Sequence, residues 1–542
     1  MRSICAIAIP CLCLAAAYGQ QPEQHANVPP HDSLSQTVQR IDTLFAESWQ
    51  NEKVTPAAVT SDAEFLRRMT LDLAGRIPAV SEVRDFLNDT STTKRRDAVE
   101  RLLDSPAFVR NFTTVLRNSL IPQANSQPQF RGLIPGFDAW LWEQLSQEQP
   151  YNEIVREIIT TKLSSNNNGG GALSSTTSPE AFFAVRELKP ENLAAGTARA
   201  FLGVRLDCAQ CHDHPFDRWS QDQFWNLAAF YAGFGRQQDD DDNPAGMMNL
   251  PEQTSVRSIR IPGTESTVSA VFLNGTTPDW DASKLTPRQI LADWIVADDN
   301  PYFAKMAVNR VWTQYFGRGI VDPVDDVSEN NPPSHPEVLE LLAADLITSG
   351  YDLKRLVRVI TATRVYQLSS LQSHQSQSEP SHFGRAVLRG LTPEQFFDSL
   401  AEAVGVYQPY RSDNPFVIDT NSPRARFLDL FRDSAESALE RETTILQALA
   451  MMNGEFIGNA TSLEESQTLK AVVEFPAMTD AQRIETLFLA TLSRQPTDVE
   501  LRRFQDYLAA NASTVTKENT KPEALSDVFW ALLNCSEFLL NH

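Results

Sequence analysis

The sequence predicts an all-α, multi-helical protein of two domains, with a short β-hairpin element near the domain boundary. Its 542 residues exceed what one compact core usually holds, so two or three domains are expected. Helix-start signatures recur along the chain, each followed by apolar residues at helical spacing. Residues 251–275 break that spacing. With 42% hydrophobic and 21% charged residues, the composition is typical of a globular protein.

The chain begins with a segment typical of export signals. Arg2 provides a positive start, and an apolar stretch follows from Ile4 to Ala17. We therefore expect residues 1–19 to be a cleaved signal peptide, with lipidation at Cys11 or Cys13 as the alternative. No later stretch reaches the roughly 18 apolar residues that span a bilayer. We expect an exported protein of the periplasm or cell surface, without a transmembrane segment once the leader is removed.

The first predicted domain spans residues 36–245 and follows a flexible lead-in at 20–35. Capping boxes at Ser61–Glu64 and Ser220–Gln223 mark two of its helix starts. Between them, residues 190–206 predict a helix that leads directly into the first cysteine after the leader.

A β-containing linker is predicted at 246–284, because apolar residues alternate on both sides of Pro262-Gly263. The second domain, 285–542, returns to the helical pattern. Ser334–Glu337 reads as a capping box, and Asp352 precedes a further helix with apolar residues at ideal spacing.

Charge narrows the range of partners. A net charge of −22 argues against nucleic acid and anionic membranes, which need clustered Lys and Arg. The acidic run Asp239–Asp242 lacks the alternate spacing of a calcium loop and indicates a solvated surface. The partner remains unknown, with a redox protein or a surface complex expected.

The chemistry of the sequence is concentrated in one short segment. After the leader, only Cys208, Cys211 and Cys535 remain, too few for a disulfide framework. Covalent haem attachment needs two thiols one turn apart and a histidine directly after the second, so that the imidazole lies under the iron. We therefore expect haem c at Cys208 and Cys211, with His212 as the proximal iron ligand.

Two other uses of this motif stay open. Cys208 and Cys211 also suit a disulfide or redox pair, since exported proteins meet oxidising conditions. A zinc site would need His214 and a remote ligand, because the adjacent Cys211 and His212 cannot easily both reach one ion. In either case the chain would be a non-catalytic binding or assembly protein.

The sequence offers several candidates for the residues around the expected haem. His214 is tethered on the proximal side, so the distal ligand is unknown. Met247, Met248 and Met306 lie downstream, as in Met-ligated cytochromes, although each suits ordinary packing. Contacts to the propionates or ring edge, or equally ordinary helix packing, are expected for Arg205, Arg218, Trp219, Phe224 and Trp225.

No catalytic residue is assigned. His335 has Asp325, Asp326 and Glu337 nearby in the sequence, which resembles a hydrolase site, but helix capping explains the same residues. Sequence motifs of serine hydrolases, zinc proteases and phosphate loops are missing.

Long stretches of the chain resemble a known family pair. Phe201–Trp219 resembles the signature of the planctomycete cytochrome C-like family, domain of unknown function fifteen-forty-nine, and Asp62–Pro78 resembles its N-terminal hallmark. The second half is similar to the companion domain of unknown function fifteen-fifty-three, in the runs Asn300–Ala304, Asn309–Trp312, Phe316–Gly319, Asn331–Glu337, Tyr366–Ser370 and Ala531–His542.

This resemblance implies a C-x-x-C-H at Cys208, Cys211 and His212, and no established activity. Many members carry an additional cytochrome c domain at the N-terminus, whereas residues 26–60 here contain no cysteine. Members tend to be encoded beside an exported phosphatase-like family, which implies a secreted or surface complex.

Overall fold

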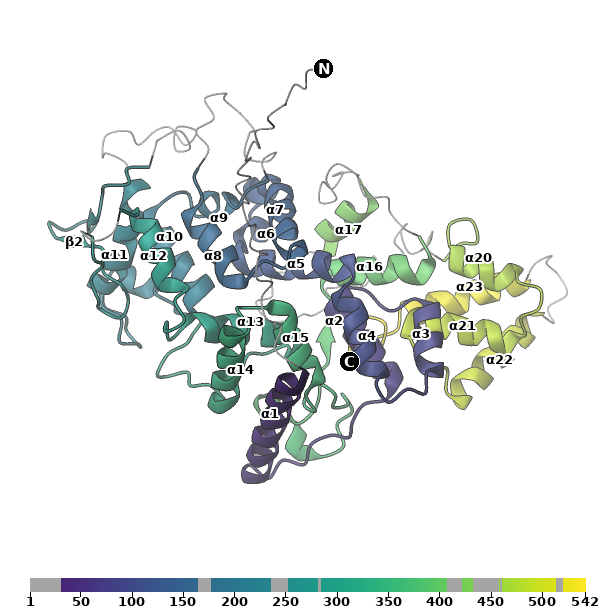
Figure 1. Cartoon of the computed structure of the whole chain (residues 1–542). Helices are drawn as coiled ribbons and strands as arrows, with labels where there is room; N and C mark the ends of the chain where they lie inside the picture. The colour runs from purple at the N-terminus through teal and green to yellow at the C-terminus, as the bar shows by residue number, and fades with distance from the viewer. Residues whose placement is uncertain are drawn as a thin grey trace, which may run out of the picture.

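The computed structural model describes residues 31–163, 177–234, 252–280, 284–406, 422–431, 458, 461–512 and 520–542. The expected signal peptide, Met247, Met248 and the Asp239–Asp242 run lie outside these ranges. Within them the chain is a multi-helical assembly with small antiparallel strand pairs, which confirms the predicted fold class (Figure 1).

Helices make up the chain on both sides of a hairpin. Before it lie α1 (His31–Asn51), α2 (Asp62–Ala74), α3 (Val80–Asn88), α4 (Lys94–Leu103), α5 (Pro106–Leu120), α6 (Gln123–Ser126), α7 (Ile134–Ser146), α8 (Tyr151–Thr160), α9 (Ala181–Ala184), α10 (Pro190–Thr197) and α11 (Gln221–Ala228). After it lie α12 (Pro287–Ile295), α13 (Phe303–Phe316), α14 (Pro336–Thr348), α15 (Leu353–Ala362), α16 (Pro393–Val404), α17 (Pro423–Phe431), α20 (Gln467–Glu474), α21 (Asp480–Leu492), α22 (Asp498–Ala512) and α23 (Thr520–Leu533).

The predicted hairpin is present. Strands β1 (Ser258–Arg260) and β2 (Thr267–Ser269) pair antiparallel, with Ile259 opposite Val268. A second pair, β3 (Arg389–Gly390) with β4 (Leu540–Asn541), joins residues far apart in the sequence. Local patterns did not predict this pairing, because two-residue strands carry no alternation of their own.

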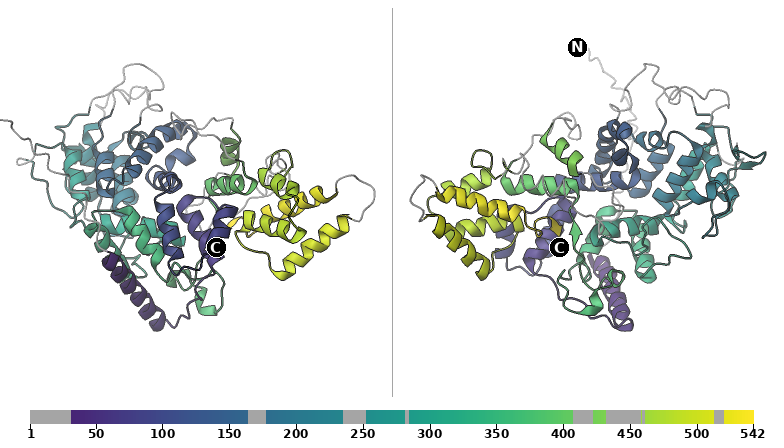
Figure 2. Two further views of the ribbon diagram at one scale, coloured as in Figure 1. Left: turned by 45° about the vertical axis from the view of Figure 1, so that its right-hand side comes forward. Right: turned by 180° about the vertical axis from the view of Figure 1, so that it is seen from behind.

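Hydrophobic side chains gather in two buried clusters. The larger one runs from α1 to Phe383, with Leu489 of α21 added to it, and so includes residues on both sides of the hairpin. The smaller one joins residues 396–538 to Leu71 of α2 and to Ile77. Helices α16–α23 accordingly lie together at one end of the molecule, and α8–α12 lie at the other (Figures 1 and 2).

Helix α2 lies between these two clusters. Its N-cap is Ser61, whose hydroxyl accepts from Glu64 N at 3.2 Å, as the capping signature predicts. The sequence suggests a single apolar face, but the structure buries every residue from Phe65 to Ala74. The C-terminal strand lies beside this helix, and Arg68 Nε donates to the His542 carbonyl at 3.2 Å.

In the part of the chain described here, none of the helices combines the length and apolar character needed to cross a bilayer.

Candidate functional site: the CxxCH loop

The two cysteines and the histidine lie in one exposed turn, which we call the CxxCH loop (residues 207–218). Asp207–Gln210 forms a 3₁₀ turn, and Cys211 follows it in a helical conformation. Because a 3₁₀ helix has three residues per turn, the side chains of Cys208 and Cys211 lie on the same side. Both thiols are free and exposed, and His212 is exposed beside them.

The helix predicted for residues 190–206 does not run into Cys208. Helix α10 ends at Thr197, a single π turn follows at Ala198–Leu202, and Gly203 ends the segment in the left-handed region at φ 68°. A Cβ at Gly203 would lie 2.8 Å from Met306 Sδ, so close packing also requires glycine there. The CxxCH loop is therefore a separate element that follows this stop.

Side chains of helix α11 bond to backbone carbonyls of the loop. Ser220 caps it and forms the predicted capping box with Gln223. Gln221 Nε2 donates to the Cys211 carbonyl at 2.9 Å, and Trp225 Nε1 donates to the Gln210 carbonyl at 2.9 Å. Neither contact was predicted, because the sequence carries no signal for a side chain that reaches back to a preceding loop.

The two histidines of the loop have different roles. His212 Nδ1 lies 2.7 Å from the Asp213 carbonyl, which can only accept. In the neutral ring the proton is therefore on Nδ1, which leaves a lone pair on Nε2. His214 Nδ1 instead accepts from Phe216 N at 3.3 Å, while its own backbone N donates to the Trp219 carbonyl at 2.8 Å. His214 thus stabilises the loop through hydrogen bonds to neighbouring backbone groups.

Aromatic residues proposed for the ring edge belong to the core. Trp219, Phe224 and Trp225 are all buried in the larger hydrophobic cluster and do not face the exposed side of the loop. Their helical spacing is equally typical of core packing, which is the reading that the structure supports. Phe216, by contrast, is 79% exposed.

The other residues considered for contacts to the haem also bond or pack within the protein. Arg205 pairs with Asp325 at 2.6 Å, and Arg218 donates to Tyr302 Oη at 2.8 Å. Met306 is 1% exposed and packs within α13, which fits its ordinary-packing reading.

His335 is buried among side chains of the fold. It occupies the N-cap of α14, but its ring makes no capping bond to that helix. Its Nε2 lies 3.2 Å from Ser48 Oγ, and the ring packs 4.7 Å from that of Phe45. Burial, with a smaller contribution from His382, lowers the pKa of His335 to about 4. The capping box predicted at Ser334 does not form, because α14 begins one residue later with His335 at its N-cap, and Ser334 Oγ donates to the Ile320 carbonyl.

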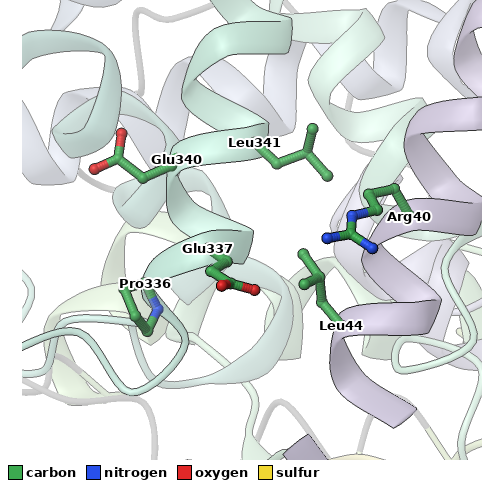
Figure 3. Close-up of a pocket in the computed structure, with 6 residues that line it drawn as sticks. All are labelled: Arg40, Leu44, Pro336, Glu337, Glu340 and Leu341. Atoms are coloured by element: carbon green, nitrogen blue, oxygen red, sulfur yellow. The ribbon is translucent and has the colours of Figure 1, made fainter. Parts of the chain in front are cut away.

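A shallow pocket of about 320 Å³ lies beside this histidine motif, between α1 and α14. Arg40 and Leu44 face Glu337 and Leu341 across it (Figure 3). Its lining contains carboxylates, an arginine and apolar side chains, and no hydroxyl or thiol nucleophile, so a hydrolase reading gains no support from it.

Across the described ranges, no three His, Cys, Asp or Glu side chains come together in a way that could hold a metal ion. Cys535 is half-buried against the smaller cluster, and burial raises the pKa of its thiol.

Comparison with protein families gives two matches in chain order. Residues 40–236 match PSCyt2, described as a protein of unknown function (DUF1549). Residues 287–426 and 416–508 match PSD1, described as a protein of unknown function (DUF1553). Neither curated proteins nor solved structures gave a significant match.

Proposed function

Residues 40–236 and 287–508 belong to the PSCyt2 and PSD1 families of unknown function, and we propose that the CxxCH loop binds one covalent haem c in a redox or electron-transfer role. The observation that carries this proposal is the arrangement of the loop. Two exposed thiols lie on one side of a turn, next to a histidine whose Nε2 is available.

The residues of the loop fit the attachment chemistry. In haem c each thiol S–H adds across a vinyl group of the porphyrin, forming a C–S bond while the hydrogen goes to the other vinyl carbon. This addition needs no external oxidant, and it needs both sulfurs within reach of one ring. The 3₁₀ turn brings Cys208 and Cys211 to one side and leaves both accessible, which supports attachment of both to one ring.

His212 would be the axial ligand. The Asp213 carbonyl orients its ring through Nδ1, as carbonyls commonly do for ligating histidines. The bound haem would supply one-electron redox chemistry at the protein surface. An exposed position suits exchange with a protein partner, consistent with a redox or surface-complex partner for this chain.

Location outside the cytoplasm is part of this proposal, because covalent haem maturation takes place there. The expected signal peptide at residues 1–19 supports it. Determining the N-terminal residue of the protein purified from an exporting host tests this step. A start at Gln20 is expected, and an uncleaved Met1 would contradict it.

A denatured pyridine haemochrome spectrum tests the cofactor. The full chain is produced in a host with cytochrome c maturation machinery, beside C208A and the matched control C535A. We expect covalent haem in the wild type and in C535A, and its loss in C208A.

Haem-free wild type from a competent host would overturn the redox proposal. Thiol titration and metal analysis of that protein would then separate the two alternatives. A disulfide or a bound zinc ion would indicate a binding or assembly protein whose motif only stabilises the turn.

A further inference from the structure

Residues matched to the second family lie against the CxxCH loop, which belongs to the first. Just before the loop begins, Val327 N donates to the Gly203 carbonyl at 2.7 Å. Arg205 donates to Asp325 Oδ1 through Nε at 2.9 Å and through Nη2 at 2.6 Å. These contacts span more than a hundred residues of sequence, so they are tertiary and not local.

The same segment reaches the far end of the loop. Asn330 Nδ2 donates to the Phe216 carbonyl, and Arg218 forms an ion pair with Glu329 at 3.6 Å. Tyr302, also from the second family region, accepts from Arg218 at 2.8 Å. One partner segment, which we call the 325–330 segment, thus contacts the far end of the CxxCH loop and the residues just before its start.

Residues of two family-like motifs fix the turn that precedes the 325–330 segment. Asn309 is buried and donates to the Val321 carbonyl at 2.8 Å and the Val324 carbonyl at 3.3 Å, while it accepts from Val321 N at 3.0 Å. A Cβ at Gly319 would lie 2.1 Å from the Val321 carbonyl oxygen. Asn309 on α13 and Gly319 therefore fix the turn that leads into the segment.

Ion pairs connect the 325–330 segment to Asp207, the residue before Cys208. Asp325 also pairs with Arg199 Nε at 3.1 Å, so one carboxylate faces two arginines, Arg199 and Arg205. Arg199 in turn lies 3.4 Å from Asp207, the residue before Cys208. Asp325 is consequently joined through Arg199 to Asp207, the first residue of the CxxCH loop.

We infer that the CxxCH site is a composite of both family regions, in which Asp325 and Asn330 are positioning residues that hold the loop. The inference rests on the proposed function in taking the loop as the site of chemistry, but its contacts involve only residues of this chain. It gives the second family region a definite role, which is to complete the site carried by the first.

Thiol reactivity of the haem-free, full-length chain tests this inference. In a C535A background only Cys208 and Cys211 remain after the leader, so the rate of reaction with a disulfide reagent reports on the loop. In D325N the two arginines lose their shared carboxylate, so the start of the loop is held less firmly, and an approximately threefold faster reaction of its more accessible thiols is expected. N330A removes one exposed amide contact and should give a smaller acceleration.

D398N is the matched control. Asp398 accepts two bonds from Arg424 at 3.2 Å, and its side chain is 19% exposed, close to the 20% of Asp325, but it lies on α16 in the other cluster. Reaction at the wild-type rate is expected for D398N, with a similar melting temperature in both aspartate variants. Equal thiol rates in D325N, N330A and D398N would overturn the inference. A haem-free wild type would remove the proposed cofactor and leave this comparison valid.

Discussion

Two segments of this chain carry long family-like motifs, and the structure uses them in opposite ways. Helix α2 is buried on all sides, and its Arg67, Arg68 and Asp72 are each at most 2% exposed. In the CxxCH loop, Cys208, Cys211 and His212 are exposed. The buried polar groups of α2 bond to fixed protein partners, whereas both thiols and one ring nitrogen in the loop have none among the described residues.

The difference shows how a structural motif can be told from a chemical one. Arg67 donates to the carbonyls of Thr491 at 2.9 Å and Phe538 at 3.0 Å, so its charge fastens the C-terminal segment to α2. Such a site loses stability when altered, because a buried partner is left unpaired. A site with free reactive atoms on an exposed loop should instead lose chemistry while the fold persists.

The largest expected effect is at Asp72. This buried carboxylate accepts from Arg389 at 2.8 Å, Tyr366 Oη at 2.9 Å and Asn541 Nδ2 at 2.7 Å. D72A leaves the Arg389 charge buried without its partner, and we expect the free energy of unfolding to fall by about 3–5 kcal/mol. Urea unfolding of the purified chain measures this loss.

A double variant sharpens the same point. D72N with R389M removes both charges, so much of the lost stability should return. If D72A lowers the free energy of unfolding by less than about 1 kcal/mol, the buried bonds of α2 do not stabilise the fold strongly, and the comparison with the CxxCH loop fails.

A smaller effect is expected from His335, which lies in another buried motif. Its folded pKa of about 4 is below the ordinary value of about 6.5, so the unfolded chain takes up a proton that the folded chain does not. This contribution to stability is complete above about pH 6.5 and is lost as the pH falls toward 4, by up to about 3 kcal/mol.

Urea unfolding at a series of pH values between 7 and 4 tests this expectation. H335Q should lose stability less steeply with falling pH than the wild type does. S48A removes the hydroxyl next to His335 Nε2 but keeps the titrating ring, so it should retain the wild-type steepness. Identical slopes in H335Q and wild type would show that this histidine is accessible in the folded protein.

Local sequence patterns predicted the helices and the hairpin well, because their causes are local. Asp352 caps α15, where Arg355 N donates to its carboxylate at 3.0 Å, and Thr392 caps α16 with Gln395 as its capping-box partner. The β1–β2 pairing required only a short alternating stretch around one turn.

Long-range partners could not be predicted in this way. Nothing near Asp72 indicates that Arg389 and Asn541 will meet it, and nothing near Cys208 indicates the 325–330 segment. Charged residues such as Arg67 look solvent-exposed in a helical pattern, because the sequence alone does not show that a second cluster covers the other face. The candidate site was therefore predicted as a motif, while its supporting residues required the structure.

The smallest expected effect on stability is at the CxxCH loop itself. His212 is exposed, and its ring bonds only to the neighbouring Asp213 carbonyl among the described residues. H212A in the haem-free chain should therefore change the free energy of unfolding by less than about 0.5 kcal/mol, as exposed substitutions usually do. Measured by the same urea titration as D72A, a loss above about 1.5 kcal/mol would place the loop in the structural framework. A near-zero value, together with the large loss in D72A, would show that the fold depends on Asp72 and not on this histidine.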